Sequence, residues 1–129
     1  MRRFPREKFG NRKDRIVTRI VCKSNIHVGE YESFLTADDL PAGDVAWLRD
    51  SVRGNQTYKA GMWRAGVSEC PYYFAADETF VMIEGVLQIM LDDGQEFEFR
   101  AGDTGSFELG THSTWKVVEP VLHFFIQTT

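Results

Sequence analysis

The pattern of hydrophobic and polar positions changes at residue 58. From there onward, short runs rich in apolar and β-branched residues alternate with glycine- and proline-containing breaks. The breaks fall at Gly66, Pro71, Gly85, Asp93-Gly94, Gly102, Gly110 and Pro120. Short strands at such spacing are typical of an all-β sandwich or barrel. We therefore predict a single β-domain over residues 58–129.

One turn in this region has a specific sequence signature. Asp93-Gly94 separates the run VLQIML from the run EFEF. A tight hairpin needs backbone with positive φ, which glycine adopts without a Cβ clash. The sequence predicts a β-hairpin here.

Residues 1–57 have a different pattern. Residues 1–15 are polar and basic, so we interpret them as a flexible arm. The run Ile16–Cys22 is rich in β-branched residues and predicts a first strand, and Tyr31–Leu35 predicts a second. We expect residues 16–57 to form an N-terminal extension of the β-domain.

The same extension contains a helix-like signal. Thr36 can accept backbone N–H groups at a helix N-terminus, with Asp39 three residues later. Val45, Leu48 and Val52 then follow at helical spacing. The spacing predicts one short helix before Gly54.

Length and composition indicate one protein class. A chain of 129 residues fits one domain. It has no apolar run of the roughly 20 residues that a membrane helix needs, and no apolar stretch of the kind found in signal peptides. Cys22 and Cys70 have no paired spacing and are expected to be reduced thiols. We expect a cytoplasmic protein with no membrane partner.

The charge is divided between the two ends of the chain. Residues 1–19 carry eight Lys or Arg against two acids, so a net charge of −4 leaves −10 for the remainder. Such an arm can contact nucleic acid, but it lacks interleaved aromatic residues for base stacking. We expect a mobile tail or an arm that packs along an acidic partner subunit, and no nucleic-acid partner.

Two glycine-framed blocks follow the spacing of a metal-enzyme family. The first contains Gly66, Tyr72, Phe74, Glu78 and Gly85. It resembles the first motif of the cupin superfamily: G, five residues, H-x-H, three or four residues, E, six residues, G. The resemblance implies that Tyr72 and Phe74 replace two metal-binding histidines, whereas Glu78 keeps its position.

The second block resembles the second cupin motif, which reads G, five residues, P-x-G, two residues, H, three residues, N. Gly102 and Gly110 match. Glu108, Ser113 and Val117 stand in place of the proline, histidine and asparagine. The glycine positions of the second motif are therefore kept, whereas its metal-binding histidine is replaced.

Further ordered motifs are similar to those of the ureidoglycine aminohydrolase-like and ethanolamine-utilisation-type cupins. They are Gly61-Met-Trp63, Asp77-Glu78, Ile83-Glu84-Gly85, Asp93-Gly94, Gly102-Asp103 and Trp115-Lys-Val117-Val-Glu119-Pro120. The resemblance implies a cupin double-stranded β-helix, also called a jelly-roll barrel. His123 stands where relatives carry a lysine that faces the pocket.

These residues are a poor set of metal ligands. A catalytic metal needs three or more converging histidine or carboxylate ligands, and only Glu78 occupies an implied ligand position. His112 lies one residue before the next such position, and a shift of one residue in a strand turns a side chain to the opposite face. A set rebuilt from Tyr72, Glu78, His112 and His123 would need ionised tyrosine, whose pKa is near 10. We expect no metal and no other cofactor.

Strand alternation places the remaining candidates around an aromatic pocket. They are Trp63, Tyr72, Phe74, Glu78, Ser113, Trp115, Val117 and His123. A carboxyl buried there would have a raised pKa, which suits Glu78 to acid or base chemistry. His123 can accept a proton. For each candidate the alternative is a structural role in the core.

Three hypotheses of function stay open at this stage. The first is a cupin that binds a small organic molecule of unassigned identity without a metal centre. The second is an aminohydrolase- or isomerase-like enzyme, with or without a metal, that uses Glu78 and His123. The third is a structural or regulatory homodimer in which the strand Ile16–Cys22 extends the partner's sheet.

Overall fold

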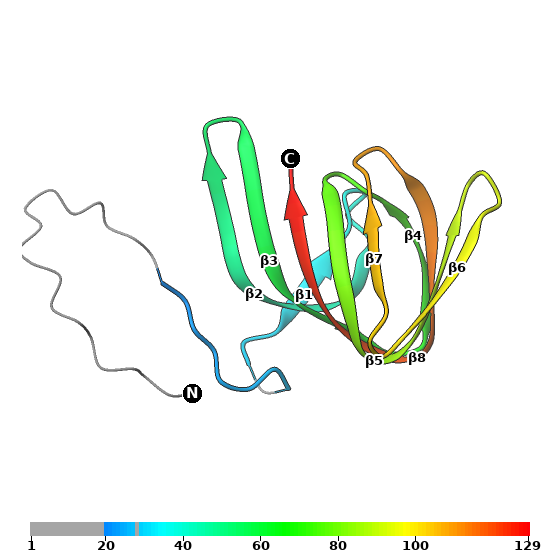
Figure 1. Ribbon diagram of the computed structural model, residues 1–129, viewed down its shortest axis with the longest axis horizontal. Coiled ribbons are helices and arrows are strands. Elements are labelled where there is room, and N and C mark those ends of the chain that lie inside the picture. Colours follow the sequence, from blue (N-terminus) through cyan, green and yellow to red (C-terminus); the bar gives the residue numbers. More distant parts are fainter. Residues whose placement is uncertain (1–19, 28) are drawn as a thin grey trace, which may run out of the picture.

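The computed structural model describes residues 20–27 and 29–129 (Figure 1). In these residues the regular elements are eight β-strands. They are β1 (Glu32–Leu35), β2 (Pro41–Arg53), β3 (Gln56–Ala65), β4 (Ser68–Tyr73), β5 (Asp77–Leu91), β6 (Glu96–Arg100), β7 (Thr104–Phe107) and β8 (His112–Thr128). The described chain contains no helix that could cross a membrane. The expected all-β fold is confirmed.

Strands β5 and β8 hold the fold together. They pair antiparallel with each other from end to end, and each changes its second neighbour midway. The first half of β5 pairs with β7 and its second half with β6. The first half of β8 pairs with β4 and its second half with β3. One continuous sheet therefore curves over at the bottom of Figure 1 and closes around a core.

A glycine makes this bend sterically feasible. Gly85 lies at the middle of β5 with a φ of 90°, and a Cβ there would overlap the carbonyl oxygen of Pro120 on β8. The β5–β8 register shifts on both sides of this point. Only glycine tolerates both the positive φ and the close backbone approach.

Alternation along β8 fills the interior. Side chains at odd positions, from Ser113 through Val117 and from Val121 through Phe125, are buried. They join a core of Phe74, Phe80, Leu87, Ile89 and Phe99 among others. A second, smaller cluster of Ala46, Met62 and Leu122 lies apart from this core.

The short helix expected over residues 36–53 is wrong, because residues 41–53 form β2. A β-bulge between Trp47 and Arg49 shifts the pairing with β3 by one residue. A bulge changes the alternation of faces midway along a strand. Of the three residues at helical spacing, Val45 is buried, Leu48 is half-buried and Val52 is 70% exposed, so their spacing does not mark one buried face.

Other N-terminal expectations have mixed outcomes. The Thr36 hydroxyl does accept a backbone N–H, from Leu40 at 3.1 Å, but in the turn between β1 and β2. The strand expected at Tyr31–Leu35 is confirmed as β1, which pairs with β2. Of the strand expected at Ile16–Cys22, residues 16–19 lie outside the described residues and 20–22 are not strand. The arm of residues 1–15 also lies outside them.

The β-domain and its hairpin can be compared with the sequence directly. The boundary expected at residue 58 falls inside β3, and β2 pairs with β3 in the same sheet. The Asp93-Gly94 hairpin between β5 and β6 is confirmed. Gly94 has a φ of 93°, and its N–H donates to the Leu91 carbonyl at 2.9 Å.

Candidate functional site

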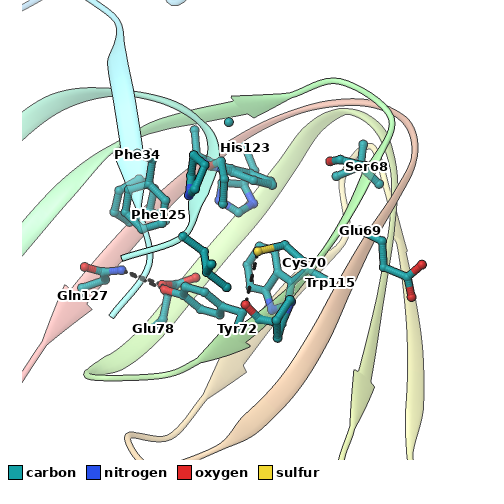
Figure 2. A pocket seen from close by; sticks show the side chains of 17 residues that line it. Phe34, Ser68, Glu69, Cys70, Tyr72, Glu78, Trp115, His123, Phe125 and Gln127 are labelled. Carbon is teal, nitrogen blue, oxygen red and sulfur yellow. Dashed lines mark hydrogen bonds between the residues drawn. The ribbon is translucent and has the colours of Figure 1, made fainter. Parts of the chain in front are cut away.

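A cavity of about 360 Å³ opens into the interior between β4, β5, β8 and the start of β2. Five aromatic side chains form much of its wall (Figure 2). They are Phe34, Trp63, Tyr72, Trp115 and Phe125. Leu40, Pro41, Ala42, Gly43, Ser68, Glu69, Cys70 and Pro71 also line it. The cavity is thus largely apolar, with few polar groups.

The structure brings most of the expected pocket residues together. Those that line the cavity are Trp63, Tyr72, Glu78, Trp115, Val117 and His123. Phe74 and Ser113 do not line it. Phe74 is buried and packs against the Tyr72 ring at 4.8 Å, and the Ser113 hydroxyl donates to the Tyr72 carbonyl at 2.7 Å. These two residues support the wall from behind.

Glu78 is a buried carboxyl with two hydrogen-bond donors. Its Oε1 accepts one bond from the Tyr72 hydroxyl and one from the Gln127 amide, each at 2.7 Å. The side chain is 3% exposed. Burial raises the pKa of Glu78, and the bonds from Gln127 and Tyr72 only partly oppose that rise. The carboxyl is therefore suited to hold or exchange a proton.

Tyr72 is fixed as a donor to that carboxyl. Burial, followed by the charge of Glu78 and their hydrogen bond, raises the pKa of Tyr72 far above its ordinary value. Gln127 Nε2 also approaches the Tyr72 hydroxyl at 3.3 Å. The phenol therefore stays protonated and orients Glu78.

His123 is a buried, neutral imidazole in an aromatic environment. Its ring lies 5.0 Å from the Trp63 ring and 4.9 Å from the Phe80 ring. Burial lowers the pKa of His123 to about 3. Its Nδ1 is buried without a hydrogen-bond partner in the described part of the chain. An unpaired buried nitrogen is unfavourable, and the aromatic rings packed around His123 supply no hydrogen bond to it.

The strands set the separation between Glu78 and His123. Glu78 is the cross-strand partner of Gln127, and His123 lies four residues from Gln127 on the same face of β8. A strand rises about 3.3 Å per residue, so the two sites are roughly 13 Å apart at Cα. Phe125 lies between them on β8. Glu78 and His123 can therefore contact two different parts of one ligand.

Sequence reasoning missed several cavity residues. Gln127, Phe34 and Phe125 lie outside the family motifs, although the alternation of β8 points to 125 and 127 once His123 is placed inward. Cys70, two residues before Tyr72 on β4, also lines the cavity. Burial raises the pKa of the Cys70 thiol, and its Sγ lies 3.3 Å from the Pro71 carbonyl oxygen. His112, expected to face opposite to the motif position at Ser113, is exposed, whereas Ser113 is buried.

The donors in the cavity do not fit a catalytic metal. No group of three or more His, Cys, Asp or Glu side chains converges within residues 20–27 and 29–129. Tyr72 and Phe74 occupy the places implied for histidine ligands, and the Tyr72 proton is committed to Glu78. A phenol held this firmly in its protonated form is a poor ligand.

The chain is similar to one family model and to several solved structures. The family described as EutQ-like cupin domain matches residues 52–124. A putative ethanolamine utilization protein Q from Salmonella typhimurium is 15% identical over 76% of this chain and 93% of its own, with a TM-score of 0.58. The EutQ protein of Clostridium difficile is 17% identical over 74% of each chain, with a TM-score of 0.56. A DUF861 family protein from Thermotoga maritima is 33% identical over 50% of this chain and 73% of its own, with a TM-score of 0.49. No curated protein matches.

Proposed function

The chain belongs to the family of EutQ-like cupin domains, and on this premise we propose that it binds a small organic molecule in the cavity around Glu78, without a metal centre. The observation that carries the proposal is a buried carboxyl, held by two donors, at the wall of an apolar cavity. Small-molecule sites are typically mostly apolar cavities of about 300–1,000 Å³ with a few placed polar groups. This cavity has that size and composition.

The arrangement of hydrogen bonds supports a binding role for the aromatic wall. The Trp63 indole N–H donates to the Ala42 carbonyl at 2.8 Å, and the Trp115 indole N–H approaches the Ser113 hydroxyl at 3.2 Å. Both indoles therefore have partners in the protein. What they offer to a ligand is their apolar ring surface, while Glu78 and His123 supply the polar contacts.

An enzyme is the second candidate, and one observation favours it. Burial raises the pKa of Glu78 and lowers that of His123. Oppositely shifted groups are typical of acid and base pairs in active sites. In this candidate Glu78 donates a proton and neutral His123 accepts one from different parts of the same substrate. Glu78→Gln would then abolish turnover while the variant stays folded.

A thermal-shift screen with small acids, amines and sugars tests the binding proposal. A compound that binds the native state raises the melting temperature, and we expect at least one class to do so. Cys70→Phe adds a ring to the cavity wall and is expected to remove the shift. Val67→Phe adds the same ring at an exposed residue outside the cavity and is the matched control.

Two results would count against the proposal. One is that no compound of any class raises the melting temperature of the wild type. The other is that Cys70→Phe, folded by circular dichroism, responds as strongly as the wild type and Val67→Phe.

A further inference from the structure

Acidic side chains line the cavity, whereas neither lysine nor arginine lines it in the described part of the chain. Glu78 lies inside the cavity, whereas Glu69 is exposed at its edge, with its carboxyl pointing away from the other lining side chains in Figure 2. His123 supplies no compensating charge near neutral pH, because burial lowers its pKa to about 3. An ionised Glu78 would therefore lack a counter-charge.

The hydrogen bonds to Glu78 do not replace that counter-charge. Tyr72 and Gln127 are neutral donors, and both bonds go to Oε1. A buried carboxylate is strongly disfavoured unless it is paired with a positive group. No positive side chain is among the causes that shift the pKa of Glu78. A ligand with a positive group would supply the counter-charge that an ionised Glu78 lacks.

The aromatic wall fits the same kind of ligand. The Tyr72 and Trp115 rings lie 4.8 Å apart, and the Trp115 and Trp63 rings lie 5.5 Å apart at nearly right angles. Figure 2 shows Tyr72 and Trp115 on the same side of the cavity as Glu78. The faces of tryptophan and tyrosine rings attract organic cations and pack against apolar groups. A carboxylate next to aromatic faces therefore favours an ammonium group.

An anionic ligand fits poorly at this site. The donors nearest to Glu78 are already used by its own Oε1. A carboxylate or phosphate in the cavity would lie near the Glu78 carboxyl with neither lysine nor arginine on the described wall, and a buried charge without a partner is strongly disfavoured. Ligands of similar shape but opposite charge are therefore expected to bind with different affinities.

We propose that the cavity binds a small organic cation, with its ammonium group against Glu78 and a flat apolar body against the aromatic wall. The inference rests on the proposed function, because it assigns a chemical class to the ligand of that site. His123 lies farther along β8 and provides a neutral partner for a polar group at the other end of the ligand.

Three probes of similar size and different charge test this assignment. They are 2-phenylethylamine, 2-phenylethanol and phenylacetate, titrated calorimetrically at pH 7 into the full-length chain. We expect the amine to bind at least about tenfold more tightly than the alcohol, and phenylacetate to give no measurable binding. Glu78→Gln is expected to weaken amine binding by about tenfold or more and to change alcohol binding little. Glu96→Gln makes the same chemical change at an exposed residue outside the cavity and is the control.

A second measurement covers the case in which Glu78→Gln does not fold. In the wild type, the side-chain carbon of Glu78 is followed by NMR as a function of pH. A bound ammonium group stabilises the carboxylate, so we expect the pKa of Glu78 to fall when 2-phenylethylamine is added and to stay unchanged with 2-phenylethanol.

The possible failures are distinguishable. If phenylacetate binds as tightly as the amine, the ligand class is wrong and the binding function stands. The same conclusion follows if Glu78→Gln leaves amine binding unchanged and the amine does not lower the pKa of Glu78. If none of the three probes binds and the thermal-shift screen finds only acids or sugars, the ligand class is again wrong and the binding function stands. If no compound of any class binds, the proposed function itself is wrong.

Discussion

Glu78 and His123 show how one cavity can shift two groups in opposite directions. Burial disfavours the charged form of each. That form is the carboxylate for Glu78, whose pKa is raised, and the imidazolium for His123, whose pKa is lowered to about 3. Near neutral pH the histidine is therefore uncharged, and charge in the site is controlled by the carboxyl and by what binds to it.

Replacing His123 tests this environment through pH-dependent stability. The pKa of His123 is below its unfolded value, so the unfolded state binds more protons between about pH 6.5 and pH 3. Its contribution to stability is present above pH 6.5 and is lost as the pH falls. Between pH 7 and pH 4, we expect the wild type to lose about 3 kcal/mol relative to His123→Phe. Urea unfolding at several pH values measures this difference.

The same substitution at exposed His112 is the control for losing one imidazole. Glu78 changes stability with pH in the opposite direction, but it is present in both proteins and cancels in the comparison. Parallel stability curves for the wild type and His123→Phe would show that His123 is not held neutral by the core.

At the level of elements, the site depends on the two bent strands. β8 carries Trp115, Val117, His123 and Gln127 on one face, and β5 presents Glu78 opposite Gln127. The bend at Gly85 lets the two halves of each strand form opposite walls around the same interior. The position of the cavity thus follows from the pairing of β5 with β8.

Gly85→Ala tests the bend. The new Cβ would overlap the Pro120 carbonyl and force a φ of 90° on alanine. We expect a loss of about 4 kcal/mol or more in the free energy of unfolding, because backbone overlap adds to conformational strain. Gly94→Ala is the matched control, since its φ is 93° and no heavy atom lies within 4 Å of the added Cβ.

For Gly94→Ala we expect a loss of about 1–2 kcal/mol, from the left-handed backbone alone. Chemical denaturation followed by circular dichroism measures both variants. Equal losses for the two would mean that close approach to Pro120 does not contribute.

The elements also show why the sequence predicts some parts of the fold better than others. Glycine spacing and the Asp93-Gly94 turn are local signals, and the structure confirms the strands that they delimit. The bulge between Trp47 and Arg49 depends on pairing with β3. The sequence around Val45, Leu48 and Val52 predicts a helix instead, because nothing local identifies which strand lies opposite.

At the level of the whole molecule, the chain has the cupin fold, with Tyr72 and Phe74 at the positions where the family motif has histidines. Motif spacing predicted that Tyr72, Glu78 and Trp115 share an interior, and they line one cavity. The role of Gln127 depends on its register opposite Glu78, a contact across 49 residues of sequence. Spacing rules cannot supply such a contact, so the hydrogen-bonded group around Glu78 became visible only in the folded chain.

Ligand binding by metal-stripped protein tests the central claim most directly. The compound from the screen with the largest thermal shift is titrated calorimetrically into protein treated with a chelator, and again after addition of Zn²⁺ or Mn²⁺. Because the cavity donors do not fit a metal, we expect the same dissociation constant in all three titrations, with elemental analysis confirming the stripped state. Binding that disappears on chelation and returns with either ion would contradict the account.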